Sequence, residues 1–101
     1  MHKFKLKIDT DAHLDIHKGI KWYNKKAPEL GRKFHKEVKQ HFEILKRMPY
    51  FRLYYLDVRC LPLKIFPYMI HFTLNEQNKT VIVRAVFPTP TSPENWKKRS
   101  S

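Results

Sequence analysis

A run of alternating residues from Tyr68 to Leu74, near the middle of the chain, constrains the fold most. Apolar residues at every second position are typical of a half-buried strand and not of a helix. Pro67 precedes the run, holds Phe66 extended and has no backbone donor, so it belongs at the first residues of a strand or at an edge. The expected strand has one face with Tyr68, Ile70, Phe72 and Leu74, and another with Met69, His71 and Thr73.

The rest of the chain supplies elements that can cover the apolar face of this strand. The same patterns predict strands over residues 3–8, 58–63, 66–74 and 80–87, with a hairpin loop at 75–79. Apolar residues at helical spacing predict helices over 10–27 and 28–48, whose short connection makes them an antiparallel hairpin. Residues 50–56 are interpreted as an aromatic-rich connector.

The predicted fold class is therefore α+β, with the order β-α-α-β-β-β. A two-helix hairpin packs on one face of a largely antiparallel four-stranded sheet. We expect one domain over residues 1–101, with a basic, frayed end at 97–101.

The charge balance narrows the choice of partners. Lys and Arg number 21 against 9 Asp and Glu, which gives a net charge of +12. Such a field suits a nucleic acid or an acidic protein, although a basic surface also serves solubility alone. No apolar run is long enough to cross a membrane and the N-terminus lacks the core of a signal peptide, so we expect a cytoplasmic protein without membrane contact. The single cysteine, Cys60, excludes an internal disulfide and is interpreted as a small buried residue.

Function is expected on the sheet face that the helices leave open. The lysines of the first strand either protect an edge against aggregation or bind a partner, and both interpretations stay open. His13 and His17 stand four residues apart but no further ligand completes a metal site, and Glu37 and His41 are interpreted as solvated surface; no metal and no cofactor is expected. The candidate contact residues for a partner or nucleic acid are Lys3, Lys5, Lys7, Arg59, Lys64, His71, Arg84 and Trp96.

Several short segments, in this order and spacing, resemble the RelE/ParE toxin superfamily of type II toxin–antitoxin systems. The resemblance covers nearly the whole chain. Its most specific segments are Arg59, Leu63-Lys64-Ile65-Phe66-Pro67-Tyr68, Val83-Arg84-Ala85-Val86 and Pro93-Glu94-Asn95-Trp96. The Phe-Pro-Tyr form is similar to the ParE side, often called plasmid stabilisation proteins.

The resemblance implies a growth-inhibiting toxin that a co-expressed, often acidic antitoxin neutralises. RelE-like members cut mRNA at the ribosome, whereas ParE-like members act on DNA gyrase. The expected assembly is a homodimer or a toxin–antitoxin hetero-oligomer. A chain of charge +12 fits an acidic antitoxin independently, because opposite charges speed association and select the partner.

The sequence departs from the family pattern where catalysis is expected. Tyr68 stands where RelE-like nucleases have an arginine, and Trp96 stands where they often have a tyrosine. Pro88 and Thr91 stand where ParE-like relatives commonly have His and Arg. The candidate catalytic residues that remain are Arg59, Lys64, His71 and Arg84.

Three functions follow from this pattern. The first is a ParE-like toxin that binds a protein target such as DNA gyrase. The second is a RelE-like, ribosome-dependent mRNA interferase in which His71 is the only candidate base. The third is a catalytically inactive relic of the toxin fold.

Overall fold

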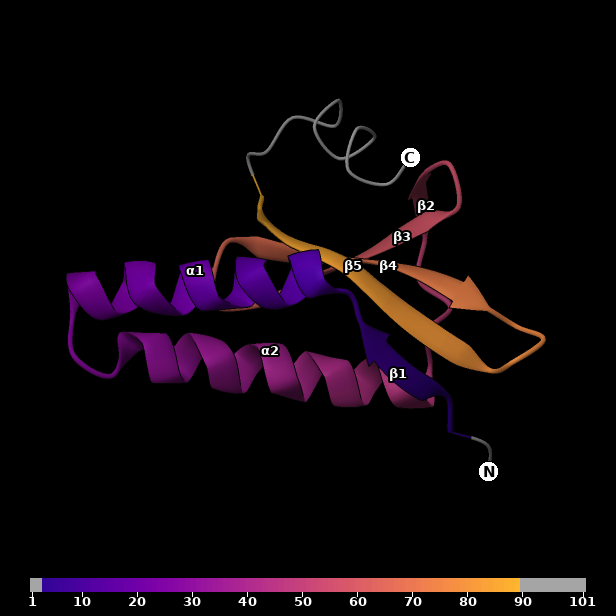
Figure 1. Ribbon diagram of the computed structural model, residues 1–101, viewed down its shortest axis with the longest axis horizontal. Helices are drawn as coiled ribbons and strands as arrows, with labels where there is room; N and C mark the ends of the chain where they lie inside the picture. The colour runs from indigo at the N-terminus through magenta and orange to yellow at the C-terminus, as the bar shows by residue number, and fades with distance from the viewer. Residues whose placement is uncertain (1–2, 90–101) are drawn as a thin grey trace.

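The protein folds into a layer of two helices and a layer of β-sheet (Figure 1). The computed structural model describes residues 3–89. Its elements, in chain order, are β1 (Lys5–Ile8), α1 (Thr10–Lys26), α2 (Leu30–Arg47), β2 (Leu53–Tyr55), β3 (Val58–Pro62), β4 (Tyr68–Asn75) and β5 (Thr80–Pro88). The predicted class and the order of the predicted elements are confirmed.

The sheet has five strands in the order β1-β5-β4-β3-β2, instead of the predicted four. β1 runs parallel to β5, and the other neighbours are antiparallel. The additional strand, β2, lies in the segment interpreted as a connector. A strand of three residues is too short to show a period of two, and its turn is at Leu56, where a φ of 46° occurs without a glycine or asparagine to indicate it.

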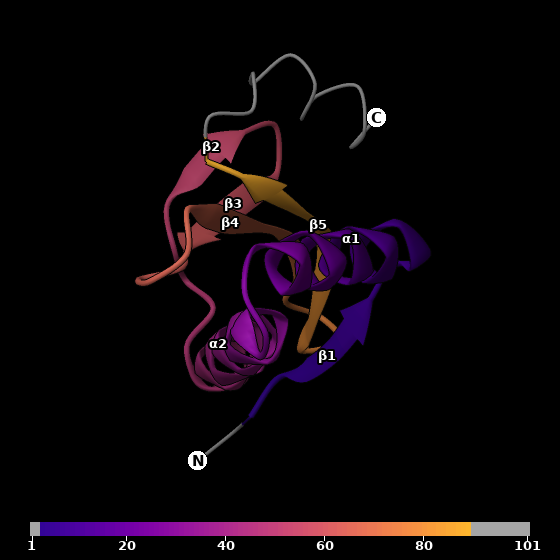
Figure 2. The same ribbon diagram turned by 90° about the vertical axis from the view of Figure 1, so that its left-hand side faces the viewer.

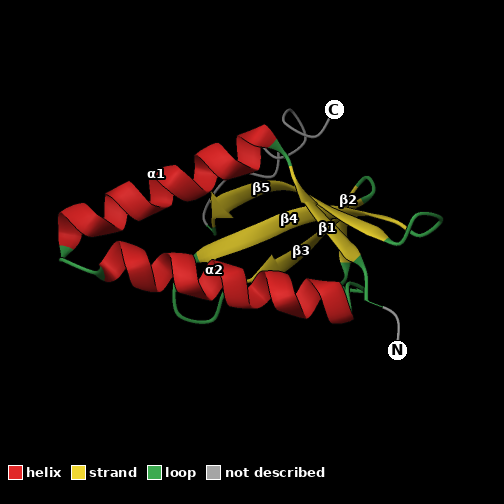
Figure 3. Ribbon diagram, turned by 60° about the horizontal axis from the view of Figure 1, so that its bottom comes forward, coloured by secondary structure: helices red, strands yellow, loops and turns green. Residues whose placement is uncertain are grey.

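Both helices cover the same face of the sheet (Figures 2 and 3). The apolar stripe predicted for the second helix lies in the main core, as does the face of β4 predicted to be apolar; the stripe consists of Leu30, Phe34, Val38, Phe42 and Leu45. Rings from α2, from β4 and from the loop before β4 meet there: the centroid of Phe34 is 5.4 Å from that of Phe66 and 4.8 Å from that of Tyr68. Gly19 on α1 lets the helices approach, because a Cβ there would lie 2.6 Å from Cε2 of Phe34.

The opposite face of the sheet is not the open surface that the sequence suggested. It carries a second, smaller cluster, in which the buried side chains are Tyr55, Val58, Cys60 and Met69, with Phe87 packed against them. Burial of Cys60 is confirmed, and burial raises the pKa of its thiol to about 12. A candidate residue of that face is therefore buried if it lies within this cluster.

Candidate functional site

Arg84 lies at a β-bulge and joins the sheet to the start of α1. Phe72 pairs with Val83 whereas His71 pairs with Ala85, so Arg84 is an extra residue in β5. Its Nη1 lies 3.0 Å from Oδ2 of Asp9, and its Nε donates to Oγ1 of Thr73 at 3.1 Å. The guanidinium therefore has an internal acidic partner. The shallow cavity of about 380 Å³ beside it also contains Asp57 and Glu76, which disfavours a phosphate there.

Arg59 lies on the other side of the sheet from His71. Arg59 pairs with Phe72, which faces the helices, while Cys60 pairs with His71 on the opposite face. The Arg59 guanidinium donates to the carbonyl oxygen of Phe51 at 2.7 Å and fixes the segment that precedes β2. The expectation that Arg59 and His71 contribute to one surface is wrong, because neighbouring positions on a strand point to opposite faces.

His71 is fully buried, which corrects its placement on an open face. Its Nδ1 lies 3.2 Å from the hydroxyl of Tyr55 and 3.4 Å from Sγ of Cys60, and its ring meets that of Phe87 edge-on at 5.2 Å. Side chains from β2, β3 and β5 therefore surround the imidazole. A base in this position is shielded from substrate by the second cluster.

Lys64 belongs to an exposed loop whose backbone is held by Glu37. The backbone N–H groups of Lys64, Ile65 and Phe66 donate to the Glu37 carboxylate at 2.8, 2.9 and 3.2 Å. Desolvation alone would raise the pKa of Glu37, but the three hydrogen bonds outweigh it and the pKa lies below its usual value. The side chains of Lys64 and Ile65 point away from the core, and that of Ile65 is 79% exposed.

Glu37 and His41 are therefore not the solvated surface that the sequence suggested. They are only 4% and 5% exposed, and Nδ1 of His41 lies 2.9 Å from the Glu37 carbonyl oxygen. Sequence reasoning missed Glu37 as an anchor because its partners come about 30 positions later in the chain, where no local pattern points back to it. An acid on the buried face of an amphipathic helix is the one signal that indicates such a role.

A hollow of about 440 Å³ adjoins this loop. It is lined by Leu30, Lys33, Lys36, Glu37, Gln40, Ile65 and Phe66. Exposed apolar atoms lie here next to two lysines, a combination that suits a partner segment with apolar and acidic side chains.

The lysines of the first strand are exposed as predicted. Lys5 and Lys7 point away from the core, whereas Leu6 and Ile8 pack against it. β1 is an edge of the sheet, a position that suits both protection of the edge and contact with a partner. Pro88 ends β5 opposite Tyr68, and the predictions for Thr91 and Trp96 lie outside the described residues.

Within residues 3–89 the four candidate catalytic residues do not form one group. Arg59 and His71 lie on opposite faces, Arg84 pairs with Asp9, and Lys64 is in the loop held by Glu37. The same part of the chain contains no group of three or more His, Cys, Asp or Glu side chains placed to hold a metal, and neither helix is long and apolar enough to cross a membrane.

The chain is a basic protein with a two-layer α+β fold, in which a helical hairpin packs on a five-stranded sheet. No family model and no curated protein sequence matches the chain. Among solved structures it is similar to the chromosomal ParDE TA system from P. aeruginosa, with a TM-score of 0.76, 18% identity, and coverage of 87% of this chain and 98% of that one.

Two further structures are from E. coli. The intact RelBE toxin–antitoxin complex gives a TM-score of 0.67 at 16% identity, covering 87% of this chain and 99% of that one. The isolated RelE toxin gives 0.65 at 15% identity, covering 96% of each. The chain thus has the fold found in these ParDE, RelBE and RelE structures.

Proposed function

We propose that this chain is the toxin of a type II toxin–antitoxin system. In this proposal it is ParE-like: it acts in the cytoplasm by binding a protein target such as DNA gyrase, and a cognate acidic antitoxin neutralises it. The support is the fold, which the chain shares with components of ParDE and RelBE systems, together with its charge of +12.

The separation of the candidate catalytic residues is the observation that favours binding over RNA cleavage. Metal-free cleavage of RNA needs a base at the 2′-hydroxyl, an acid at the leaving oxygen and cations at the phosphate, all within reach of one another. Of the described candidates, His71 is buried and Arg84 is ion-paired. Arg59 is engaged on the opposite face by the Phe51 carbonyl.

The hollow beside residues 63–67 is the surface that we assign to the antitoxin. An amphipathic segment can place an apolar side chain against Ile65 and acidic side chains near Lys33 and Lys36. Glu37 holds the loop in one conformation before binding, so the loop loses little conformational entropy when the complex forms.

A RelE-like mRNA interferase is the alternative. It is supported by the similarity to the RelE structures and by the row of exposed lysines on β1, which suits an RNA backbone. The inactive relic remains the third possibility, since an intact fold does not require activity.

Induction of the chain in bacteria that carry an SOS reporter tests the proposal. The expected result is growth arrest with reporter induction, and inhibition of DNA supercoiling when purified gyrase is mixed with the purified chain. Harmless expression would favour the relic and contradict the proposal. Arrest without reporter induction, accompanied by cut mRNA, would favour the interferase.

A further inference from the structure

The outward side of α2 carries a row of basic side chains, of which the proposed function uses only Lys36. Arg32, His35, Lys36 and Lys39 are all exposed, and their spacing of three and four residues places them along one side of the helix. From Arg32 to Lys39 the row is about 10 Å long at the helical rise per residue. In Figure 3 this helix lies in front of the sheet.

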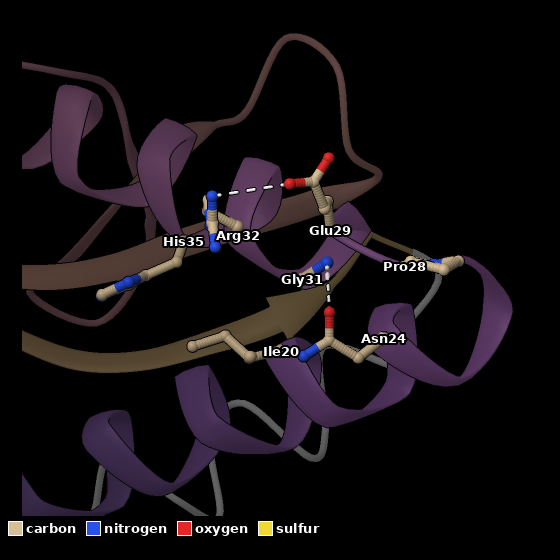
Figure 4. Close-up of a pocket in the computed structure, with 7 residues that line it drawn as sticks. All are labelled: Ile20, Asn24, Pro28, Glu29, Gly31, Arg32 and His35. Carbon is tan, nitrogen blue, oxygen red and sulfur yellow. Dashed lines mark hydrogen bonds and ion pairs between the residues drawn. The ribbon is translucent and has the colours of Figure 1, made fainter.

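The row lines two adjoining hollows that share Arg32 and His35, and together they are called the groove. One hollow of about 450 Å³ is formed by Arg32, His35, Lys36, Lys39, Gln40 and Glu43. Arg32 and His35 also line a second hollow of about 480 Å³, at the end of the helical hairpin (Figure 4). There the carboxamide of Asn24 accepts a hydrogen bond from the Gly31 backbone at 3.0 Å, which joins the two helices under the groove.

The groove keeps most of its positive charge. Glu29 lies 3.5 Å from Arg32, but both side chains are largely exposed, so the pair is weak. Glu43, at the other end, is engaged by Lys46 at 2.9 Å. Neither Lys36 nor Lys39 has an ion pair with an acid of residues 3–89.

The chemistry of the lining selects among polyanions. All six residues of the first hollow are polar or charged, whereas the hollow at Ile65 also has Leu30 and Phe66 in its lining. No Phe, Tyr or Trp side chain lines this hollow to stack an unpaired base. Double-stranded RNA is recognised across its wide minor groove over about 16 base pairs. A basic row that covers only about two turns of α2 is too short to span that length.

Duplex DNA carries one charge per about 1.7 Å of its axis, so a row of about 10 Å faces several phosphates at once. We infer that the basic groove along α2 binds the phosphate backbone of duplex DNA without reading its sequence. Contacts of this kind need only cations at the right spacing. The surface adjoins the one assigned to the antitoxin and shares Lys36 and Gln40 with it, and the inference holds for any of the three functions.

His35 adds a dependence on pH. Burial lowers its pKa, and the charges of Lys39 on the same helix and of His17 on α1 lower it further; Arg32, Lys36 and Glu43 line the same hollow. A bound phosphate stabilises the protonated imidazole, so the pKa of His35 is higher in the complex than in the free protein. Binding then takes up a proton, and affinity for DNA rises as pH falls through the range in which His35 titrates.

The test is fluorescence anisotropy of a labelled duplex DNA of about 20 base pairs with the full chain, across a range of salt concentrations. The triple variant Arg32→Gln, Lys36→Gln, Lys39→Gln is compared with Lys18→Gln, Lys21→Gln, Lys25→Gln, which removes the same charge from exposed positions of α1. At about 0.1 M salt we expect the groove variant to bind about 100-fold more weakly, and its slope of log K against log salt to fall by about 2 to 3. The α1 variant should change affinity less than about threefold, and His35→Gln should flatten the pH dependence.

Four results would overturn the inference. These are no binding of DNA by the parent chain, equal losses in the two triple variants, tighter binding of a matched RNA duplex, and tighter binding of a poly-glutamate peptide that only the groove variant loses. The last result would identify the groove as a surface for an acidic protein. Circular dichroism melting of each variant separates a binding defect from unfolding, since all six positions are exposed.

Discussion

Replacement of Glu37 by glutamine changes the anchor of the 63–67 loop with almost no change of shape. In the parent chain Oε2 accepts from Lys64 and Ile65, while Oε1 accepts from Phe66. Glutamine has one oxygen, so its NH₂ group meets at least one backbone N–H, and the remaining bonds lose the charge of their acceptor. A hydrogen bond to a charged group contributes about 1.5–3 kcal/mol and a neutral one about 0.5–1.5 kcal/mol.

One hydrogen bond is lost and two are weakened. Because contributions of neighbouring bonds are not fully additive, we expect a destabilisation of about 3 kcal/mol at neutral pH. For a domain of this size that corresponds to a fall in melting temperature of about 10 °C or more. The assay is urea unfolding followed by circular dichroism, at pH 7 and at steps down to pH 3. Glu43→Gln is the matched control, because that carboxylate is on the exposed surface and should leave stability nearly unchanged.

The pH series checks the sign of the effect. Because the folded pKa of Glu37 lies below its unfolded value, its contribution is complete above the unfolded pKa of about 4.3 and is lost as pH falls through the folded pKa. The difference between parent and Glu37→Gln should therefore shrink at the acid end. A Glu37→Gln variant as stable as Glu43→Gln, or a deficit that does not depend on pH, would refute this account of the loop.

Two further predictions concern packing and partner binding. Gly19→Ala should destabilise the protein by about 1–3 kcal/mol in urea unfolding despite the better helix propensity of alanine, because its Cβ would overlap the ring of Phe34; a neutral result would mean that the helices separate without cost. Ile65→Asp should leave the melting temperature unchanged, since Ile65 is 79% exposed, but weaken neutralisation by the antitoxin in co-expression growth assays; full neutralisation would remove Ile65 from the proposed interface.

The sheet and the helical hairpin were predictable because their signals are local. The alternation from Tyr68 to Leu74 assigned the core face of β4 correctly, and the helical stripe of α2 predicted which side it buries. β2 was missed because three residues carry no period.

The site was harder to predict, since its geometry depends on contacts between distant segments. Glu37 is recognised as an anchor only when the loop after β3 is placed beside α2. His71 has the alternation expected of the face away from the helices, but no pattern indicated that Tyr55 and Phe87 would cover it. The pairing of Arg84 with Asp9 depends on a bulge, which has no sequence signal here.

The central claim is that the proposed toxin acts by binding and not by cutting RNA. Its most direct test is to map the ends of ribosome-bound mRNA after induction of the parent chain and of an Arg84→Gln variant. The account predicts growth arrest by both chains with no new mRNA ends, because Arg84 is held by Asp9 and Thr73 in a structural role. New ends at translating ribosomes in the parent chain that disappear with Arg84→Gln would contradict it.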